Sequence, residues 1–186
     1  MASKRLRQAQ KGRSMIEMLG VLAIVGILSA GGIAGYSMAM QTYKTNLLIE
    51  RIQLLSSRIR TAWKNGDYSG LTNTTLINSG KISAKDLENP FGGTLTVRYG
   101  AALGKGYFYI DISPTPIPVE TCIDLIMTYW GDESVFWGMG TGITSNTAGT
   151  MQFRSDQAKK PYPANFTDAK EACEDTTENA VNFYFK

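Results

Sequence analysis

The strongest constraint on this chain is an uncharged stretch near its N-terminus. Met18 to Tyr43 contains 26 residues without Asp, Glu, Lys or Arg, and Leu, Ile, Val, Ala and Gly dominate it as far as Tyr36. About 20 predominantly apolar residues suffice for a helix to cross the hydrocarbon core of a bilayer, so the stretch predicts a membrane-spanning helix. Basic residues precede it between positions 4 and 13. Because basic flanks stay in the cytoplasm, we expect the rest of the chain on the other side of the membrane.

Charge and composition exclude several classes of function. Four of the 19 Lys and Arg residues lie within the first twelve positions. The remainder of the chain has 15 Lys and Arg residues against 16 Asp and Glu residues, a net charge of −1. A nucleic-acid-binding protein needs a basic face on its folded part, so we expect no nucleic-acid binding. The chain has no histidine, which removes His-based catalytic triads and His-ligated metals.

The remaining polar residues show no recognisable catalytic pattern. The acidic residues between Asp124 and Glu178 have no spacing typical of a glycosidase pair or an EF-hand loop. The glycines at 138–142 lack the lysine of a phosphate-binding loop. We therefore expect no enzymatic activity, no cofactor and no metal site.

The junction between the basic flank and the apolar stretch carries a specific motif. It reads Lys11-Gly12-Arg13-Ser14-Met15-Ile16-Glu17, followed directly by the apolar stretch. This combination of a short basic leader, a fixed Gly-to-Glu interval and a helix of spanning length resembles the class III signal of type IV prepilins. The resemblance implies that a prepilin peptidase cleaves after Gly12 and that Arg13 becomes the N-methylated first residue. Pilins usually begin with Phe, Met or Leu, so Arg13 departs from the family pattern; the alternative is an uncleaved signal anchor.

Glu17 needs a partner if it enters the membrane. A charged side chain within the hydrocarbon costs roughly 2.5 to 3.5 kcal/mol on insertion scales. The resemblance supplies the partner, because in type IV pilins this carboxylate pairs with the freed N-terminal amino group of a neighbouring subunit. A charge-assisted hydrogen bond of this kind would set the axial register of a filament, a use of buried charges that is well attested.

The helix is expected to continue beyond the membrane. After Tyr43 the apolar residues recur at intervals of three and four, which is typical of an amphipathic helix. Asn65-Gly66 is a strong helix stop. Residues 14–64 then form one helix of about 75 Å, with an apolar half at 13–43 and an amphipathic half at 44–64. Four glycines at 26, 31, 32 and 35 allow close helix contacts or a flexible segment, and ordinary membrane-helix composition is an equal alternative.

The segment 65–186 is expected to form a globular head. Asn89-Pro90-Phe91-Gly92-Gly93 reads as a turn and also resembles a turn of type IVb pilins. The other expected elements are a short helix at 83–87, a hairpin of strands 94–99 and 107–112, a helix at 119–129, a loop at 131–150, a strand at 150–153, a helix at 167–174 and a strand at 181–185. An antiparallel sheet packed on the long helix accommodates this order. The predicted fold class is α+β, and the resemblance implies the pilin fold.

Cys122 and Cys173 are the only cysteines. Both follow the membrane helix, in a compartment where disulfides persist, and their bond would close a loop of about 50 residues worth roughly 4 kcal/mol in the chain-entropy model. A C-terminal region bounded by a disulfide, here 122–173, is also what the resemblance implies. Two buried thiols without a bond are the alternative.

The resemblance implies a structural role. The chain is expected to be a type IVb major pilin that enters the bacterial inner membrane, loses residues 1–12 and is polymerised by inner-membrane assembly machinery into an extracellular helical homopolymer. Such a pilus serves adhesion, aggregation or conjugation. Two alternatives remain at this point: a pseudopilin of a type II secretion system, and a membrane-anchored adhesin or receptor domain that does not polymerise.

Overall fold

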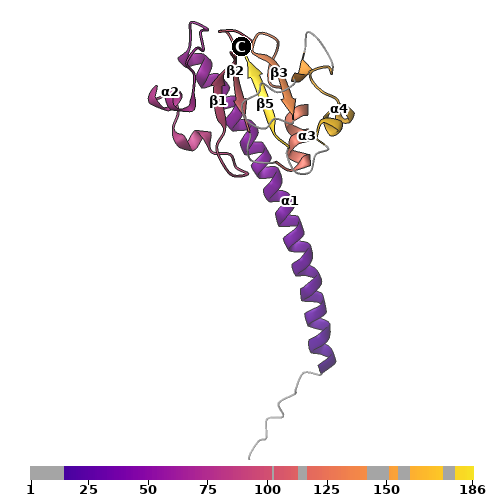
Figure 1. Cartoon of the computed structure of the whole chain (residues 1–186). Coiled ribbons are helices and arrows are strands. Elements are labelled where there is room, and N and C mark those ends of the chain that lie inside the picture. The colour runs from indigo at the N-terminus through magenta and orange to yellow at the C-terminus, as the bar shows by residue number, and fades with distance from the viewer. Residues whose placement is uncertain (1–14, 102, 113–116, 142–150, 155–159, 174–178) are drawn as a thin grey trace, which may run out of the picture. The chain divides into compact units, whose positions relative to one another are not determined.

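The computed structural model describes residues 15–101, 103–112, 117–141, 151–154, 160–173 and 179–186 (Figure 1). They belong to two compact units, one ending at Met40 and the other running from Gln41 to Lys186. The expected leader at 1–12, its last residue Gly12 and the expected first mature residue Arg13 lie outside the described residues.

The N-terminal helix α1 runs from Met15 to Ala62 without interruption. It ends two residues before the expected boundary, where the Trp63 amide donates to Ile59 O and the Gly66 amide donates to Trp63 O. Gly66 has a φ of 69°, the left-handed conformation expected of a helix stop. The Asn65-Gly66 stop signal is therefore confirmed.

The C-terminal part of α1 supplies one side of the core of the head. Leu48, Ile52, Leu55 and Ile59 share one helix face and are fully buried. They join a single hydrophobic cluster with Phe108, Phe183 and other residues of the sheet, and Figure 1 shows this part of α1 passing across one face of the sheet. The amphipathic pattern after Tyr43 thus predicted the buried face correctly.

The sheet is antiparallel and has five strands in the order β1-β2-β5-β3-β4. The strands are β1 (Thr96–Tyr99), β2 (Phe108–Asp111), β3 (Phe136–Thr141), β4 (Met151–Arg154) and β5 (Val181–Phe185). The last strand lies in the middle of the sheet, where it pairs with β2 on one side and β3 on the other. All five residues of β5 are buried.

One sequence expectation for the head is wrong. Residues 131–150 were expected to form a loop, but Phe136–Thr141 is strand β3. Its glycines look unfavourable for a strand in isolation. In the sheet Gly138 is paired with Tyr184 of β5 and Gly140 with Asn182, so pairing with a strand about 40 residues further along the chain makes this segment a strand. The glycines at 138 and 140 are sheet positions and not part of a surface loop.

The remaining helices are short and surround the sheet. Helix α2 (Asn73–Asn78) was not expected from the sequence; Thr72 caps it through a reciprocal capping box with Thr75. The 3₁₀ helix η1 (Ala84–Leu87) matches the expected short helix and its Ser83–Asp86 capping box. Helices α3 (Val119–Met127) and α4 (Phe166–Ala172) also match expected helices, within two residues at each end.

The disulfide joins α3 to the end of α4. Cys122 and Cys173 are bonded, with their Cα atoms 5.9 Å apart, and both are fully buried. Asn165 begins α4 by accepting a hydrogen bond from the amide of Asp168 at 2.9 Å. Helix α4 has only seven residues, too few for a stable helix in water. The disulfide therefore helps to hold this helix in place.

We predict that removing the disulfide lowers the stability of the head. The double substitution Cys122→Ser and Cys173→Ser should decrease the free energy of unfolding by about 2 to 5 kcal/mol, measured by denaturant unfolding of the purified chain. Reductant should shift the wild-type transition to that of the variant and leave the variant unchanged. Labelling of both thiols in the denatured, non-reduced wild type would show that the bond does not exist.

Two adjacent leucines of α1 give a matched test of the core. Leu55 is 0% exposed and Leu54 is 37% exposed. Leu55→Ala should cost about 2 to 5 kcal/mol of unfolding free energy because it leaves a cavity, whereas Leu54→Ala should cost well under half as much. Equal losses in thermal or denaturant unfolding would contradict the placement of α1 on the sheet.

Candidate functional site

Glu17 lies in the first turn of α1 and is exposed in the single chain. A carboxylate at this position is favoured by the helix dipole, whose positive end lies at the first turn. The structure thus places the residue expected to mediate subunit pairing at the accessible start of the helix. Gly12 and Arg13, the expected cleavage residues, lie outside the described residues.

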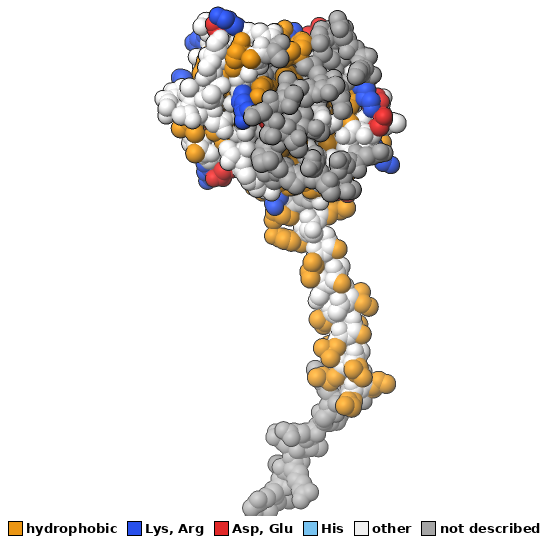
Figure 2. Space-filling model, viewed as in Figure 1, with side chains coloured by type: hydrophobic (Ala, Val, Ile, Leu, Met, Phe, Trp, Pro, Cys, Tyr) orange, Lys and Arg blue, Asp and Glu red, His pale blue; other side chains and the backbone are white. Residues whose placement is uncertain are grey.

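The first part of α1 exposes an apolar surface. This helix contains a window of mean hydropathy 2.1, long and apolar enough to cross a membrane, and none of that window is buried within the chain. Figure 2 shows apolar side chains along this part of α1. The exposed large apolar side chains before Tyr36 are Met15, Ile16, Met18, Leu19, Val21, Leu22, Ile24, Val25, Ile27, Leu28 and Ile33. A surface of this extent requires lipid or other protein to cover it.

The glycines of the apolar stretch do not break the helix. Gly26, Gly31, Gly32 and Gly35 all lie within α1, and a Cβ atom added at any of them would meet nothing within 4 Å. No neighbouring atom of the described residues therefore requires glycine at these positions. They leave shallow positions on the helix surface where another helix can approach closely.

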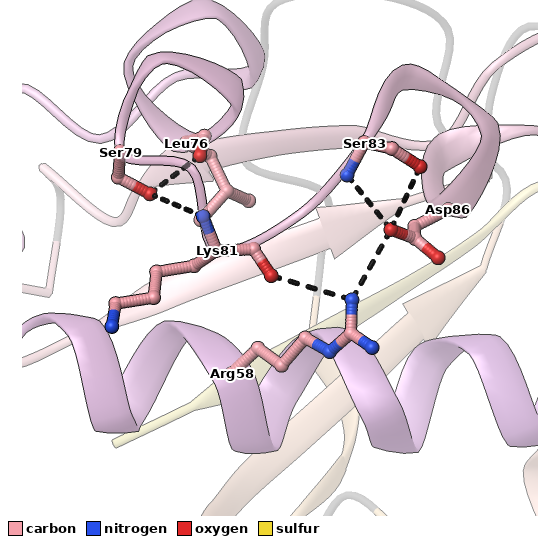
Figure 3. Close-up of polar contacts among 6 residues, drawn as sticks. All are labelled: Arg58, Leu76, Ser79, Lys81, Ser83 and Asp86. Atoms are coloured by element: carbon pink, nitrogen blue, oxygen red, sulfur yellow. Dashed lines mark hydrogen bonds and ion pairs between the residues drawn. The ribbon is translucent and has the colours of Figure 1, made fainter.

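A polar cluster attaches the segment after α1 to the helix (Figure 3). Arg58 of α1 donates from Nη1 to Asp86 Oδ2 at 3.2 Å and to Lys81 O at 3.3 Å. Asp86 also accepts hydrogen bonds from the amide of Ser83 at 2.8 Å and from its hydroxyl at 3.0 Å. The Ser83 amide is the main cause that lowers the pKa of Asp86, and Arg58 contributes further. One carboxylate therefore serves as helix cap and as ion-pair partner.

A second set of polar contacts ties α3 to α1. The hydroxyls of Thr45 and Thr121 are hydrogen-bonded at 2.9 Å and both residues are buried. Gln41 Nε2 donates to Glu120 Oε2 at 2.5 Å. Together with the disulfide, these contacts link α1, α3 and α4. Neither Arg58 nor the Thr45–Thr121 pair was identified from the sequence, because each partner lies tens of residues away.

The described residues offer no metal centre. Among them, no group of three or more Cys, Asp or Glu side chains could hold a metal ion. The candidate residues that the structure does describe are Glu17, in the first turn of the exposed apolar helix, and the bonded cysteines of the head.

Comparison with known proteins gives matches over nearly the whole chain. The major structural subunit of bundle-forming pilus from Escherichia coli O111:H- is 29% identical over 190 residues, covering 97% of this chain and 96% of that protein. The corresponding subunit from Escherichia coli O127:H6 (strain E2348/69 / EPEC) is 28% identical over 189 residues, with the same coverage. No protein-family model matches the chain.

A solved structure shares the fold. The crystal structure of TcpA, a type IV pilin from Vibrio cholerae El Tor biotype, aligns with a TM-score of 0.54 and 18% identity. The alignment covers 76% of this chain and 98% of that one. The long N-terminal helix packed on an antiparallel sheet is therefore the α+β pilin fold that the sequence predicted. The chain thus shares its fold with a type IV pilin and resembles major structural subunits of a pilus along nearly its whole length, in agreement with the expected resemblance to type IVb pilins.

Proposed function

We propose that this chain is a major structural subunit of a type IV pilus. The observation that carries the proposal is its similarity to bundle-forming pilus subunits along nearly the whole length of both proteins. The exposed apolar part of α1 supports it, because polymerised subunits can cover this surface with one another's helices. As a structural subunit the chain needs no enzymatic activity, cofactor or metal.

The path to the filament begins in the membrane. Residues 1–12 act as a leader that keeps the N-terminus in the cytoplasm while the apolar helix enters the inner membrane. A prepilin peptidase cleaves after Gly12, and the amino group of Arg13 is methylated. Inner-membrane assembly machinery then extracts the subunit into an extracellular helical homopolymer that serves adhesion, aggregation or conjugation.

Glu17 is the residue that selects the register of assembly. It lies in the first turn of α1 and follows Arg13 by four residues in the sequence. The amino group of Arg13 on a neighbouring subunit provides the opposite charge. In a core without water, a carboxylate accepts a strong charge-assisted hydrogen bond only from a donor at the right height, so the pair fixes the axial offset between subunits.

The rival functions have less support. The curated relatives are major structural subunits of a pilus, which favours a pilin over a pseudopilin of a secretion system and over a receptor or adhesin domain that stays in the membrane. Electron microscopy of material sheared from the cell surface, probed with an antibody against this chain, tests the proposal. Labelled filaments would support it, and label confined to membranes would refute it.

We predict that the subunit in filaments is shorter than the full chain by residues 1–12. The motivation is the Gly12-to-Glu17 interval that matches the prepilin signal. Intact-mass measurement of purified filaments should give a chain that starts at methylated Arg13. A mass that retains the leader would contradict cleavage at Gly12.

We predict that Glu17→Ala blocks assembly and not membrane insertion. Removing the carboxylate eases insertion, by roughly 2.5 to 3.5 kcal/mol. It also strands the amino group of a neighbouring subunit in a core without water, and breaking a buried pair typically costs about 3 to 5 kcal/mol. Cells should contain normal levels of processed subunit and few or no filaments.

Glu50→Ala provides the matched control for this substitution. Glu50 is an exposed glutamate of α1 that lies beyond the apolar stretch, so its removal tests helix and charge effects without affecting the register pair. This variant should form filaments in normal number. Wild-type numbers of filaments in the Glu17→Ala strain would show that Glu17 does not set the register.

A further inference from the structure

We propose that residues 71–73 cover the free edge of the sheet and so keep strand β1 from pairing with β1 of a second copy of this chain. We call these three residues, Leu71, Thr72 and Asn73, the edge latch. The inference concerns the head alone and does not depend on whether the chain forms a filament. It assigns to Asn73 a role in preventing self-association of the head.

Strand β1 is an edge strand of high pairing tendency. In the order β1-β2-β5-β3-β4 it has a strand neighbour only on the side of β2, among the strands that the structure describes. Residues 94–99 are rich in β-branched and aromatic side chains, contain no Gly or Pro and carry one charge, at Arg98. The main-chain groups of such an edge pair readily with another chain unless something covers them.

The side chain of Asn73 takes the place of a neighbouring strand at this edge. Its Nδ2 donates to Leu95 O at 2.9 Å, and its Oδ1 accepts from the Val97 amide at 2.7 Å. A carboxamide offers the same donor and acceptor as a peptide unit. One side chain therefore satisfies two main-chain groups that a strand of another molecule would otherwise bind.

The backbone of the edge latch covers the rest of β1. The Tyr99 amide donates to Leu71 O at 3.2 Å, and Thr72 forms an isolated antiparallel bridge with Arg98. Figure 1 shows α2, which begins at Asn73, beside β1. The edge latch thus contacts β1 as far as its last residue.

The covered groups match those that would join two copies of β1. In an antiparallel pair, every second residue directs both its N–H and its C=O to the same neighbour. The edge latch bonds to Leu95, Val97 and Tyr99, which are spaced in this way. With Val97 opposite Val97 of a second copy, each Leu95 would lie opposite a Tyr99, and each N–H would meet a C=O. The contact would have the twofold symmetry that is commonest between identical subunits.

Local contacts hold Asn73 in position. The Thr72 amide donates to Thr75 Oγ1 at 2.8 Å, and the Thr75 amide donates to Thr72 Oγ1 at 3.2 Å, the capping box of α2. The Thr75 hydroxyl also donates to Gly70 O at 3.1 Å. Leu76, one turn into α2, is fully buried. Asn73 is therefore anchored on its own side before it contacts β1.

The inference is tested on the full-length chain in detergent micelles, at low and at high protein concentration. Asn73→Ala removes both side-chain bonds to β1. At low concentration, amide exchange in the peptide covering 95–99 should be about two- to tenfold faster than in the wild type, the effect of a lost hydrogen bond. At high concentration the protein mass from light scattering should rise to about twice that of the wild type, and this exchange should slow again.

Two further variants separate edge pairing from a general loss of stability. Asn73→Asp also loses the bond to Leu95 O, but it leaves a negative charge at the edge, which disfavours strand pairing. Its mass should equal that of the wild type, and its exchange should not depend on concentration. Asn78→Ala removes an exposed asparagine at the other end of α2 and should behave as the wild type. The apolar part of α1 is the same in every chain, so it cannot cause a difference between them.

Exchange of the peptide covering β5 reports the fold of the head and should be the same in all four chains. Faster exchange of β5 in Asn73→Ala would show that Asn73 stabilises the whole head, and this would refute a separate edge latch. Wild-type mass of Asn73→Ala at high concentration would refute the inference, as would equal association of Asn73→Asp. These results leave the proposed function untouched, because filaments on cells test that function separately.

Discussion

The exposed apolar surface of α1 is the constraint on which the rest of the molecule depends. From Met15 to Tyr36 the helix has no part of its apolar window buried within the chain, and water is a poor environment for so much apolar area. The apolar surface therefore needs an environment other than water, and under the proposed function lipid and then the helices of other subunits provide it. A carboxylate in either environment is costly without a positive partner, which is why the proposal pairs Glu17 with an amino group.

The sheet of the head depends on its central strand, β5. This strand lies between β2 and β3 and is buried along its length, so β2 and β3 are joined in one sheet only through β5. The disulfide between Cys122 and Cys173 holds α4, which precedes β5 in the chain, against α3. The buried Thr45–Thr121 hydrogen bond then ties α3 to α1. A continuous path of covalent and polar links thus runs from α1 through α3 to the end of α4.

The sequence predicted features that depend on local spacing and missed those that depend on distant partners. The continuous helix, its buried face at Leu48 and Leu55, the hairpin and the capping box at Ser83 all follow from residues close together in the chain. Strand β3 was mistaken for a loop because its glycines look unfavourable for a strand in isolation, and its pairing with β5 depends on residues far along the chain. The attachment of Arg58 to Asp86 spans 28 residues, and no local pattern specifies such a pairing.

The apolar and polar contacts of α1 with the head differ in how much free energy they contribute. Each fully buried Leu or Ile of α1 contributes about 1.5 to 3 kcal/mol relative to an exposed side chain. The Arg58–Asp86 ion pair has side chains that are 39% and 28% exposed, and partly exposed pairs of this kind contribute only about 0 to 1 kcal/mol. The apolar face therefore holds the head on α1. The polar cluster has too little energy for that task, but its directional hydrogen bonds determine where the segment around η1 lies along the helix.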